Sequence, residues 1–264
     1  MTLEQKIVAC TGCNRGIGLS FVKAAARKKN HLILINRKYD QSLENDLIQL
    51  GALSVKTLVC DLSQSSQVEN LTEQLTHYQI DVFFNNAGLL TGGLIEDQNW
   101  SDIEKMLFVN VNALIRLTQA MVKQMLKLKS GVIINHGSVS SIMHFPCAST
   151  YSAAKAAVWA FTDCIEQELK NTGVRTLCLI TPGIKTKMFD EIEQMYSANL
   201  KVPQDSLNPD VYADQIIEAI EKEKSVLWPQ GSTGMGLFVS LHFRNVFNRL
   251  VRFGFKRSNS DNQL

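Results

Sequence analysis

The chain has 264 residues, which is enough for one large α/β domain with a buried core and short for two domains. Apolar residues make up 45% of the chain and charged residues 20%, a balance that excludes a largely disordered or fibrous protein. The formal net charge of +2 at pH 7 is too small to indicate nucleic-acid binding, and the six cysteines show no metal-ligand cadence, so we expect reduced thiols and no metal site.

Short apolar runs alternate with longer helical patterns from the start of the chain. The expected strands cover residues 7–10, 31–35, 55–59, 82–84, 132–134 and 175–180. These runs lack the polar alternation of a half-exposed strand, and crossover helices must fill the gaps between them. The pattern predicts an α/β fold of the Rossmann type, a doubly wound parallel sheet of about seven strands with helices on both faces.

Two long central helices are expected over residues 101–127 and 152–171, where apolar residues recur at helical spacing. The pattern weakens after Met188, with prolines as breakers, and a helix resumes over 211–221. We expect residues 188–224 to act as a lid on the substrate side. Residues 1–257 are expected to form a single domain, and the polar tail 258–264 is expected to be disordered.

A glycine-rich turn follows the first expected strand and leads directly into a helical pattern: Thr11-Gly12-Cys13-Asn14-Arg15-Gly16-Ile17-Gly18. Glycines permit a tight turn and let the backbone approach a pyrophosphate, whose charge is favoured by the free N–H groups at a helix start. An ordinary tight turn is the alternative, but the position after the first strand favours a dinucleotide site. The expected cofactor contacts here are Gly12, Asn14, Arg15, Gly16, Ile17 and Gly18.

The end of the second expected strand indicates which dinucleotide binds. A site that prefers NAD places a carboxylate there for the ribose 2′-hydroxyl, whereas this chain reads Ile35-Asn36-Arg37-Lys38. Arg37 can bind a 2′-phosphate with its planar guanidinium, and Arg15 can approach the same phosphate from the other side. We therefore expect NADP(H), with solvated loop charges as the alternative.

Tyr151 and Lys155 open the second long helix, and their i,i+4 spacing puts phenol and ammonium on one helical face. A free phenol has a pKa of about 10 and is a poor base near neutrality. A neighbouring cation favours the phenolate, so we expect Lys155 to lower the pKa of Tyr151 toward the working range. A tyrosine and a lysine at this spacing on an ordinary amphipathic helix are the alternative.

The motifs together resemble the short-chain dehydrogenase/reductase family over about residues 6–190. That family shows T-G-x-x-x-G-x-G followed, in order, by residues that match Asp61-Leu62, Asn85-Asn86-Ala87-Gly88, Asn110, Ser138, Tyr151 and Lys155. The resemblance is greatest to the single-domain members, including β-ketoacyl carrier-protein reductases and broad-specificity bacterial reductases. It implies catalytic residues Asn110, Ser138, Tyr151 and Lys155.

The resemblance also implies a role for each matched residue. Asp61, followed by Leu62, would accept from the adenine amino group, and the turn Asn86-Ala87-Gly88 would back the adenine-side ribose. Ser138 would hold the substrate oxygen together with Tyr151, which exchanges the proton, and Lys155 would reach the nicotinamide ribose. Asn110 would bend its helix and hold a water that links Lys155 to solvent.

A loop after the sixth strand departs from the family pattern. The family has three residues between Pro-Gly and a threonine, whereas Pro182-Gly183-Ile184-Lys185-Thr186 leaves two. Pro182, Gly183, Ile184 and Thr186 remain the expected contacts of the nicotinamide side, although the shorter loop leaves open which backbone group flanks the carboxamide.

The expected function is hydride transfer between NADP(H) and a ketone, an aldehyde or a secondary alcohol. Residues 143–150 and 188–209 are expected to line the substrate pocket, and their Met, Phe, Ile and Tyr side chains suggest an apolar small molecule. A non-catalytic NADP(H)-binding regulator and an alcohol dehydrogenase that works oxidatively are the alternatives. We expect no nucleic-acid partner and, by resemblance, a homodimer or homotetramer.

The C-terminal segment 234–257 is apolar and basic, with Phe243, Phe247 and Leu250 spaced for one helical face. It could lie on an anionic membrane surface or cover an apolar pocket, but a packed or subunit-interface helix is the favoured interpretation. The N-terminus has no leader pattern, and no apolar run reaches the roughly 18 residues of a membrane span. We expect a cytoplasmic protein, with peripheral membrane contact left open.

Overall fold

A computed structural model describes residues 1–196, 199 and 206–257 of the chain. The expected disordered tail, 258–264, lies outside the described residues. Part of the expected lid, residues 197–198 and 200–205, also lies outside them.

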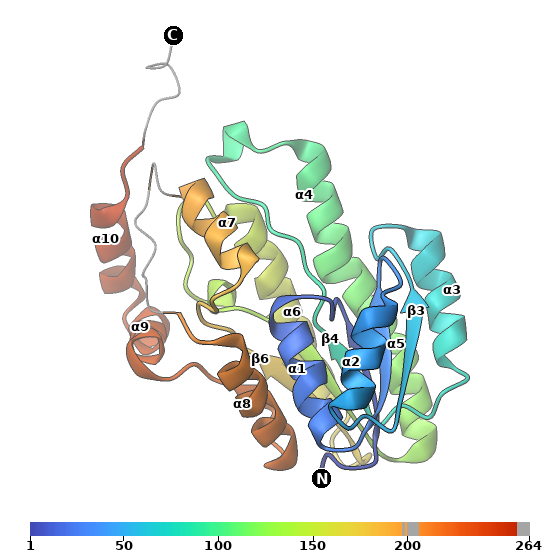
Figure 1. Cartoon of the computed structure of the whole chain (residues 1–264). Coiled ribbons are helices and arrows are strands. Elements are labelled where there is room, and N and C mark those ends of the chain that lie inside the picture. Colours follow the sequence, from blue (N-terminus) through green and yellow to red (C-terminus); the bar gives the residue numbers. More distant parts are fainter. Residues whose placement is uncertain (197–198, 200–205, 258–264) are drawn as a thin grey trace.

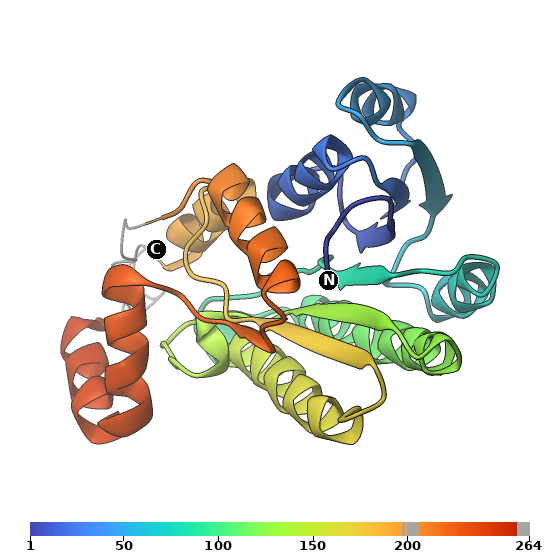
Figure 2. The ribbon, with the colours of Figure 1, turned by 90° about the horizontal axis from the view of Figure 1, so that it is seen from below.

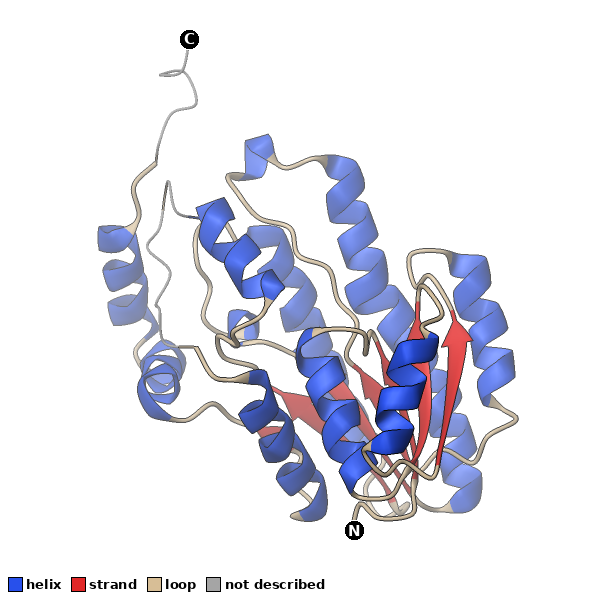
Figure 3. Ribbon diagram, viewed as in Figure 1, coloured by secondary structure: helices blue, strands red, loops and turns tan. Residues whose placement is uncertain are grey.

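The core is one parallel sheet with the strand order β3-β2-β1-β4-β5-β6-β7 (Figure 3). Its strands are β1 (Ile7–Thr11), β2 (His31–Asn36), β3 (Ser54–Val59), β4 (Val82–Asn85), β5 (Gly131–His136), β6 (Val174–Leu179) and β7 (Val226–Leu227). β1 is central, and its residue Cys10 pairs with Leu34 of β2 on one side and with Phe84 of β4 on the other. The predicted Rossmann-type fold with about seven strands is confirmed.

Helices cover both faces of the sheet (Figures 1 and 2). One face carries α1 (Gly16–Arg27), α2 (Gln41–Gln49) and α8 (Pro209–Glu221), and the other carries α3 (Ser65–Leu75), α5 (Leu114–Leu128) and α6 (Ser149–Glu168). Each face has its own apolar core, one built around Phe21 and Phe84 and the other around Phe83 and Met121. Strands buried on both faces explain why their sequence shows continuous apolar runs.

The first long helix is continuous but not uniform. It consists of α4 (Trp100–Leu107), the π-helical stretch η2 (Phe108–Ala113) and α5, which together cover the expected 101–127. Two short 3₁₀ turns, η1 (Ile95–Asp97) and η3 (Val139–Ser141), lie in loops at the end of the sheet where the strands finish. The π-helical stretch contains Asn110, the residue expected to bend this helix.

The remaining helices are α7 (Lys187–Tyr196), α9 (Gly231–His242) and α10 (Arg244–Gly254). The amphipathic C-terminal segment is thus two helices, because the chain leaves helical geometry at Phe243 (φ −130°, ψ 51°). Figures 1 and 2 show both helices beside the β7 end of the sheet. No helix in the described ranges combines the length and the apolar character needed to cross a bilayer.

Candidate active site

The site lies at the carboxyl edge of the sheet, where the order of the strands reverses between β1 and β4. Ligands of open α/β sheets bind at such a switch point. The ends of β1, β4, β5 and β6 deliver the glycine-rich turn, the Asn86–Gly88 turn, Ser138 and the 182–186 loop to this edge. The fold therefore brings together, at this edge of the sheet, the segments to which the family resemblance assigned roles.

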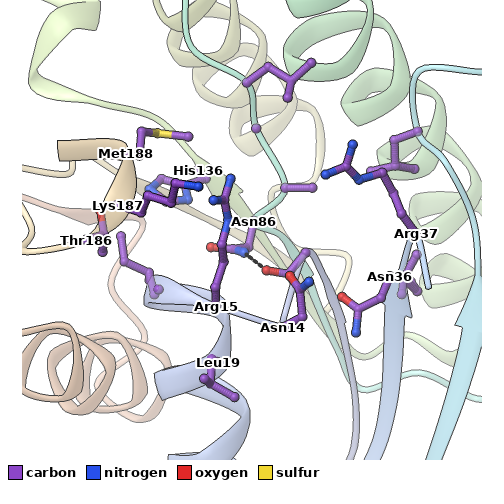
Figure 4. Close-up of a pocket in the computed structure, with 18 of the residues that line it drawn as sticks. Asn14, Arg15, Leu19, Asn36, Arg37, Asn86, His136, Thr186, Lys187 and Met188 are labelled. Atoms are coloured by element: carbon purple, nitrogen blue, oxygen red, sulfur yellow. Dashed lines mark hydrogen bonds between the residues drawn. The ribbon is translucent and has the colours of Figure 1, made fainter. Parts of the chain in front are cut away.

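The glycine-rich turn is closely packed against the turn after β4. Gly12 has a φ of +65°, and a Cβ added there would lie 3.0 Å from Ala87 Cα. The Asn86 side-chain amide donates to the carbonyl oxygens of Thr11 and Gly12, both at 2.9 Å. Figure 4 shows Asn86 beside the glycine-rich turn, with one of its hydrogen bonds drawn. Two backbone amides after β4 in turn donate to the Thr11 hydroxyl. The two turns form one rigid unit, so Asn86 has a bracing function that the resemblance did not indicate.

Gly18 does not line the cleft but packs beneath it. A Cβ at this position would lie 2.4 Å from Asn86 Nδ2 and 2.5 Å from the Gly12 carbonyl oxygen. Only a residue without a Cβ leaves α1 this close to the Asn86 brace. Gly18 therefore acts on the expected site through its packing.

Asn36, at the end of β2, is a buried residue that the sequence reasoning passed over. Its Oδ1 accepts from the Cys13 backbone amide at 2.9 Å, and its Nδ2 is buried without a hydrogen-bond partner among the described residues. Asn36 thus supports the glycine-rich turn from below. Cys13 and Cys10, three positions apart, both have free buried thiols, and burial raises the pKa of Cys10.

A cleft of about 480 Å³ runs along the glycine-rich turn and the ends of β2 and β3. Among the described residues, its lining carries six cationic side chains against two carboxylates, those of Asp61 and Asp210; the cations are Arg15, Lys23, Arg37, Lys105, Lys185 and Lys187. Figure 4 shows Arg37 and Arg15 entering the same cleft from opposite sides. This charge balance suits a ligand with several phosphate groups. The four lysines come from three elements distant in sequence, so no local pattern could have predicted them.

Asp61 lies at the far end of this cleft. Its Oδ1 accepts from the backbone amide and the hydroxyl of Ser63, at 2.9 and 2.8 Å. Burial tends to raise the pKa of the Asp61 carboxyl, but these two hydrogen bonds, with the charge of Arg37, hold it below its ordinary value. Asp61 is therefore a carboxylate and can accept a further hydrogen bond, as the resemblance implies.

Three residues of the expected catalytic set, Ser138, Tyr151 and Lys155, meet in a second pocket of about 550 Å³ that continues from the cleft. Ser138 follows β5, and its Oγ accepts from the Ser140 amide at 3.1 Å, the capping role that a serine after a strand often has. The same hydroxyl lines the pocket together with Tyr151 and Lys155 of α6. Lys155 Nζ donates to the His136 carbonyl oxygen at 2.6 Å and lies 5.7 Å from the centre of the Tyr151 ring.

The titration of these groups is dominated by burial. Burial raises the pKa of Tyr151 to about 12, and a hydrogen bond with Ser138 offsets only part of this. Burial also lowers the pKa of Lys155 to about 8 and that of His136 to about 3, the latter with help from the Lys155 charge. The expectation that Lys155 lowers the pKa of Tyr151 is therefore wrong for this structure, in which burial raises that pKa. Near neutral pH, Tyr151 carries its proton, Lys155 is charged and His136 is neutral.

Asn110 stands one layer behind the pocket. Its side chain accepts from the Leu89 amide at 2.8 Å and donates to the Leu89 carbonyl at 2.9 Å. Asn110 is buried within the π-helical stretch, so the side chain ties this distorted turn to the loop after β4. The loop that contains Gly88 thereby holds a constant position beside Lys155, whose Nζ would be 3.9 Å from a Cβ on Gly88.

The shortened 182–186 loop is held from its outer side. Leu207 pairs with it on both sides, since its amide donates to the Gly183 carbonyl and its carbonyl accepts from the Lys185 amide, both at 2.9 Å. On the inner side, Thr186 faces the glycine-rich turn, with its Cγ2 3.3 Å from where a Cβ on Gly16 would lie. The loop therefore closes the junction between cleft and pocket, and its expected contacts with the nicotinamide stay a prediction.

The second pocket has a mainly apolar wall. Met143, Phe145, Phe189, Ile192 and Tyr196 contribute to it, and so do residues of both C-terminal helices. Tyr196 belongs to the segment 188–209 that was expected to line the pocket, and it is buried. Burial, together with the charges of Tyr151 and Cys147, raises the pKa of Tyr196. The sequence patterns left open the position of the C-terminal segment, which packs on the fold and lines the pocket through Leu250, Val251 and Gly254.

The sequence pattern of the short chain dehydrogenase family matches residues 6–197, well over half of the chain. The chain belongs to the short-chain dehydrogenase/reductase family. Among curated members of the family, an uncharacterized oxidoreductase of Staphylococcus aureus is 30% identical over 226 residues, which cover 85% of this chain and 94% of that protein. Another, from Staphylococcus saprophyticus, is 31% identical over 84% of this chain and 93% of its own length.

Solved structures of family members share the whole fold. A short chain dehydrogenase from Burkholderia cenocepacia in complex with NADP aligns with a TM-score of 0.79 and 20% identity, over 95% of this chain and 99% of that one. A short-chain dehydrogenase from Sphingobium yanoikuyae in complex with NADPH gives 0.75 and 20%, over 97% and 98%. The alcohol dehydrogenase from Comamonas testosteroni that is specific for bulky-bulky ketones gives 0.78 and 19%, over 98% of each chain.

Proposed function

We propose that this protein is an NADPH-dependent oxidoreductase that transfers hydride between the nicotinamide and the carbonyl or carbinol carbon of an apolar small molecule. The observation that carries the proposal is the junction of the two cavities. Asn86, Gly88, His136 and Thr186 line both of them, and Tyr151 lines the substrate side within reach of this junction. A carbonyl held by Ser138 and Tyr151 would thus lie against the nicotinamide end of a dinucleotide in the cleft.

When bound, the nicotinamide cofactor supplies or accepts the hydride. The residues of the chain handle the proton and the charge. In the reductive direction Tyr151, which carries its proton near neutral pH, donates it to the oxygen as negative charge builds there, and the Ser138 hydroxyl donates a second hydrogen bond. Lys155 places its positive charge beside the phenol and stabilises the phenolate that results. Asn110 keeps the Gly88 loop in place beside this lysine.

The cofactor preference rests on charge. The cleft carries an excess of cations, and the two arginines that enter it from opposite sides suit the extra phosphate of NADP(H). No carboxylate stands at the end of β2, where an NAD site would hold the ribose diol. The family members solved with NADP or NADPH support the same choice.

The substrate class rests on the apolar wall of the second pocket. The Comamonas testosteroni alcohol dehydrogenase, which shares this fold and is specific for bulky-bulky ketones, supports a large ketone as substrate. We further propose a cytoplasmic location, which the free thiols of all six cysteines favour, and a homodimer or homotetramer as working assembly.

The direct experiment is to follow NADPH absorbance with a panel of aldehydes and ketones of increasing apolar size, and to identify the alcohol products. We expect turnover with NADPH that exceeds turnover with NADH, and a preference for the larger apolar carbonyls. Binding of NADPH without turnover of any carbonyl or alcohol would favour the non-catalytic alternative.

A further inference from the structure

The two C-terminal helices present a continuous apolar surface, and none of the described residues covers it. Its members are large side chains that are each at least half exposed, and Phe253 is 92% exposed. The α9 and α10 parts join where the rings of Phe238 and Phe243 lie 6.4 Å apart. We call this set the C-terminal apolar surface: Met235, Phe238, Leu241, Phe243, Val246, Leu250 and Phe253.

These side chains are not a displaced part of the core. The inward faces of the same helices are already satisfied, because Leu237 and Phe247 are buried against Met143 and Ile180. On α10 the exposed members recur at positions 246, 250 and 253, which share one helical face, and Phe243 directly precedes this helix. Each helix is therefore apolar on two faces, one that the fold uses and one that faces outward. Exposed apolar patches of this kind mark interaction sites.

The segment that carries the surface has positive charges and no negative ones. Residues 231–257 contain five cations and no aspartate or glutamate; the cations are Arg244, Arg249, Arg252, Lys256 and Arg257. Arg257 pairs with Glu96 and Arg244 contacts His144. Arg249 and Arg252, both on α10 beside Phe253, make no ion pair among the described residues. An apolar face flanked by two such arginines complements anionic lipid headgroups above acyl chains.

We propose that the C-terminal apolar surface docks the protein on an anionic bilayer, with Phe253 and its neighbours at the acyl boundary and Arg249 and Arg252 at the headgroups. A second copy of the chain is a poorer occupant. In a two-fold interface, both subunits contribute the same surface. Arg249 and Arg252 would then lie near the same arginines of the second copy, and residues 231–257 contain no carboxylate to pair with them. A lipid surface supplies the missing negative charge.

The second pocket lies next to the C-terminal apolar surface, which links the proposed docking to the binding of substrate. Leu250 belongs to the apolar surface and also lines the pocket, next to Val251 and Gly254. The pocket therefore extends to the edge of the C-terminal apolar surface. Resting on the proposed function, this arrangement lets an apolar carbonyl or alcohol pass from the lipid to the active site with little exposure to water.

The test is co-sedimentation of the full-length protein with vesicles of phosphatidylcholine alone or of phosphatidylcholine and phosphatidylglycerol in equal amounts. We expect binding to the anionic vesicles that weakens with added salt, and little binding to the neutral ones. Arg249→Ser with Arg252→Ser, and separately Phe238→Ser with Phe253→Ser, should each lower the partition coefficient roughly tenfold or more. The matched control is Trp100→Ser with Lys170→Glu, an exposed aromatic and an exposed lysine elsewhere, which should bind as the wild type does.

A second readout separates this proposal from the proposed function. None of the four substituted residues lines either cavity, so NADPH turnover of a small water-soluble carbonyl should be unchanged in both double variants. Failure of the wild type to bind anionic vesicles at low salt would overturn the docking proposal whatever the turnover. A concentration-dependent dimer that the Phe238→Ser, Phe253→Ser variant abolishes, with no vesicle binding, would assign the surface to a second copy instead.

Discussion

Substitution of Gly18 by alanine probes the link between the glycine-rich turn and the Asn86 brace. The new Cβ would lie 2.4 Å from Asn86 Nδ2, so the amide must leave the two carbonyl oxygens that it holds at 2.9 Å. Each hydrogen bond lost costs about 1 kcal/mol, and the crowding of a well-packed site costs about 1 to 3 kcal/mol. Alanine returns about 1 kcal/mol as the better helix former within α1. We expect the free energy of unfolding to fall by about 3 kcal/mol.

For a chain of this length, about 2 °C is lost per kcal/mol, so the Tm of Gly18→Ala without cofactor should lie about 6 °C below that of the wild type. The Kd for NADPH should rise as well, because the turn that receives the pyrophosphate loses its support. Circular dichroism on heating and fluorescence titration measure the two effects. Gly254→Ala is the control, since a Cβ there meets nothing within 4 Å. A Gly18→Ala protein that melts and binds NADPH as the wild type does would refute this reasoning.

Three further outcomes follow from the same geometry. Arg37→Asp should weaken NADPH binding about 10- to 100-fold without weakening NADH binding, because a charge-assisted contact with the 2′-phosphate is replaced by repulsion. An unchanged ratio of the two Kd values would contradict the phosphate-binding role of Arg37. Burial lowers the pKa of Lys155 to about 8, so this lysine loses its charge at a lower pH than free lysine does. We therefore expect kcat/KM for reduction to fall as the pH rises through about 8. A kcat/KM that stays constant up to the pKa of free lysine would contradict this prediction. Asn110→Ala should lower the free energy of urea unfolding by about 2 kcal/mol, because two hydrogen bonds to the partly buried backbone groups of Leu89 are lost. Stability equal to that of the wild type would show that the π-helical stretch does not depend on this side chain.

The elements that could be predicted from the sequence are those with a local signal. The glycine-rich turn after β1 and the i,i+4 pair of Tyr151 and Lys155 are such patterns, and the structure brings both to the same edge of the sheet. β7 escaped prediction because two residues, Val226–Leu227, form too short an apolar run. The break at Phe243 escaped because apolar spacing continues across it from one helix to the next.

The rest of the site depends on contacts between distant segments. Lys23, Lys105 and Lys187 line the same cleft only because α1, α4 and the start of α7 lie next to it in the fold. The direction of the Tyr151 pKa was wrong from the sequence for the same reason. Spacing showed the nearby lysine, but the depth of burial, which dominates, is a property of the packed chain. Gly18 and Asn110 matched the family pattern in the sequence, but only the structure shows how they act. Gly18 packs against Asn86, and Asn110 forms hydrogen bonds with Leu89.

The most direct measurement is the rate of NADPH-dependent carbonyl reduction by Tyr151→Phe, with Tyr78→Phe as the control outside both cavities. The substituted ring keeps the apolar packing of α6, and the exchange removes only the proton donor. We expect kcat to fall about 10²- to 10⁴-fold with NADPH affinity retained, while the control turns over as the wild type does. Equal rates for the wild type and Tyr151→Phe would contradict the assignment of this phenol as the acid of the reaction.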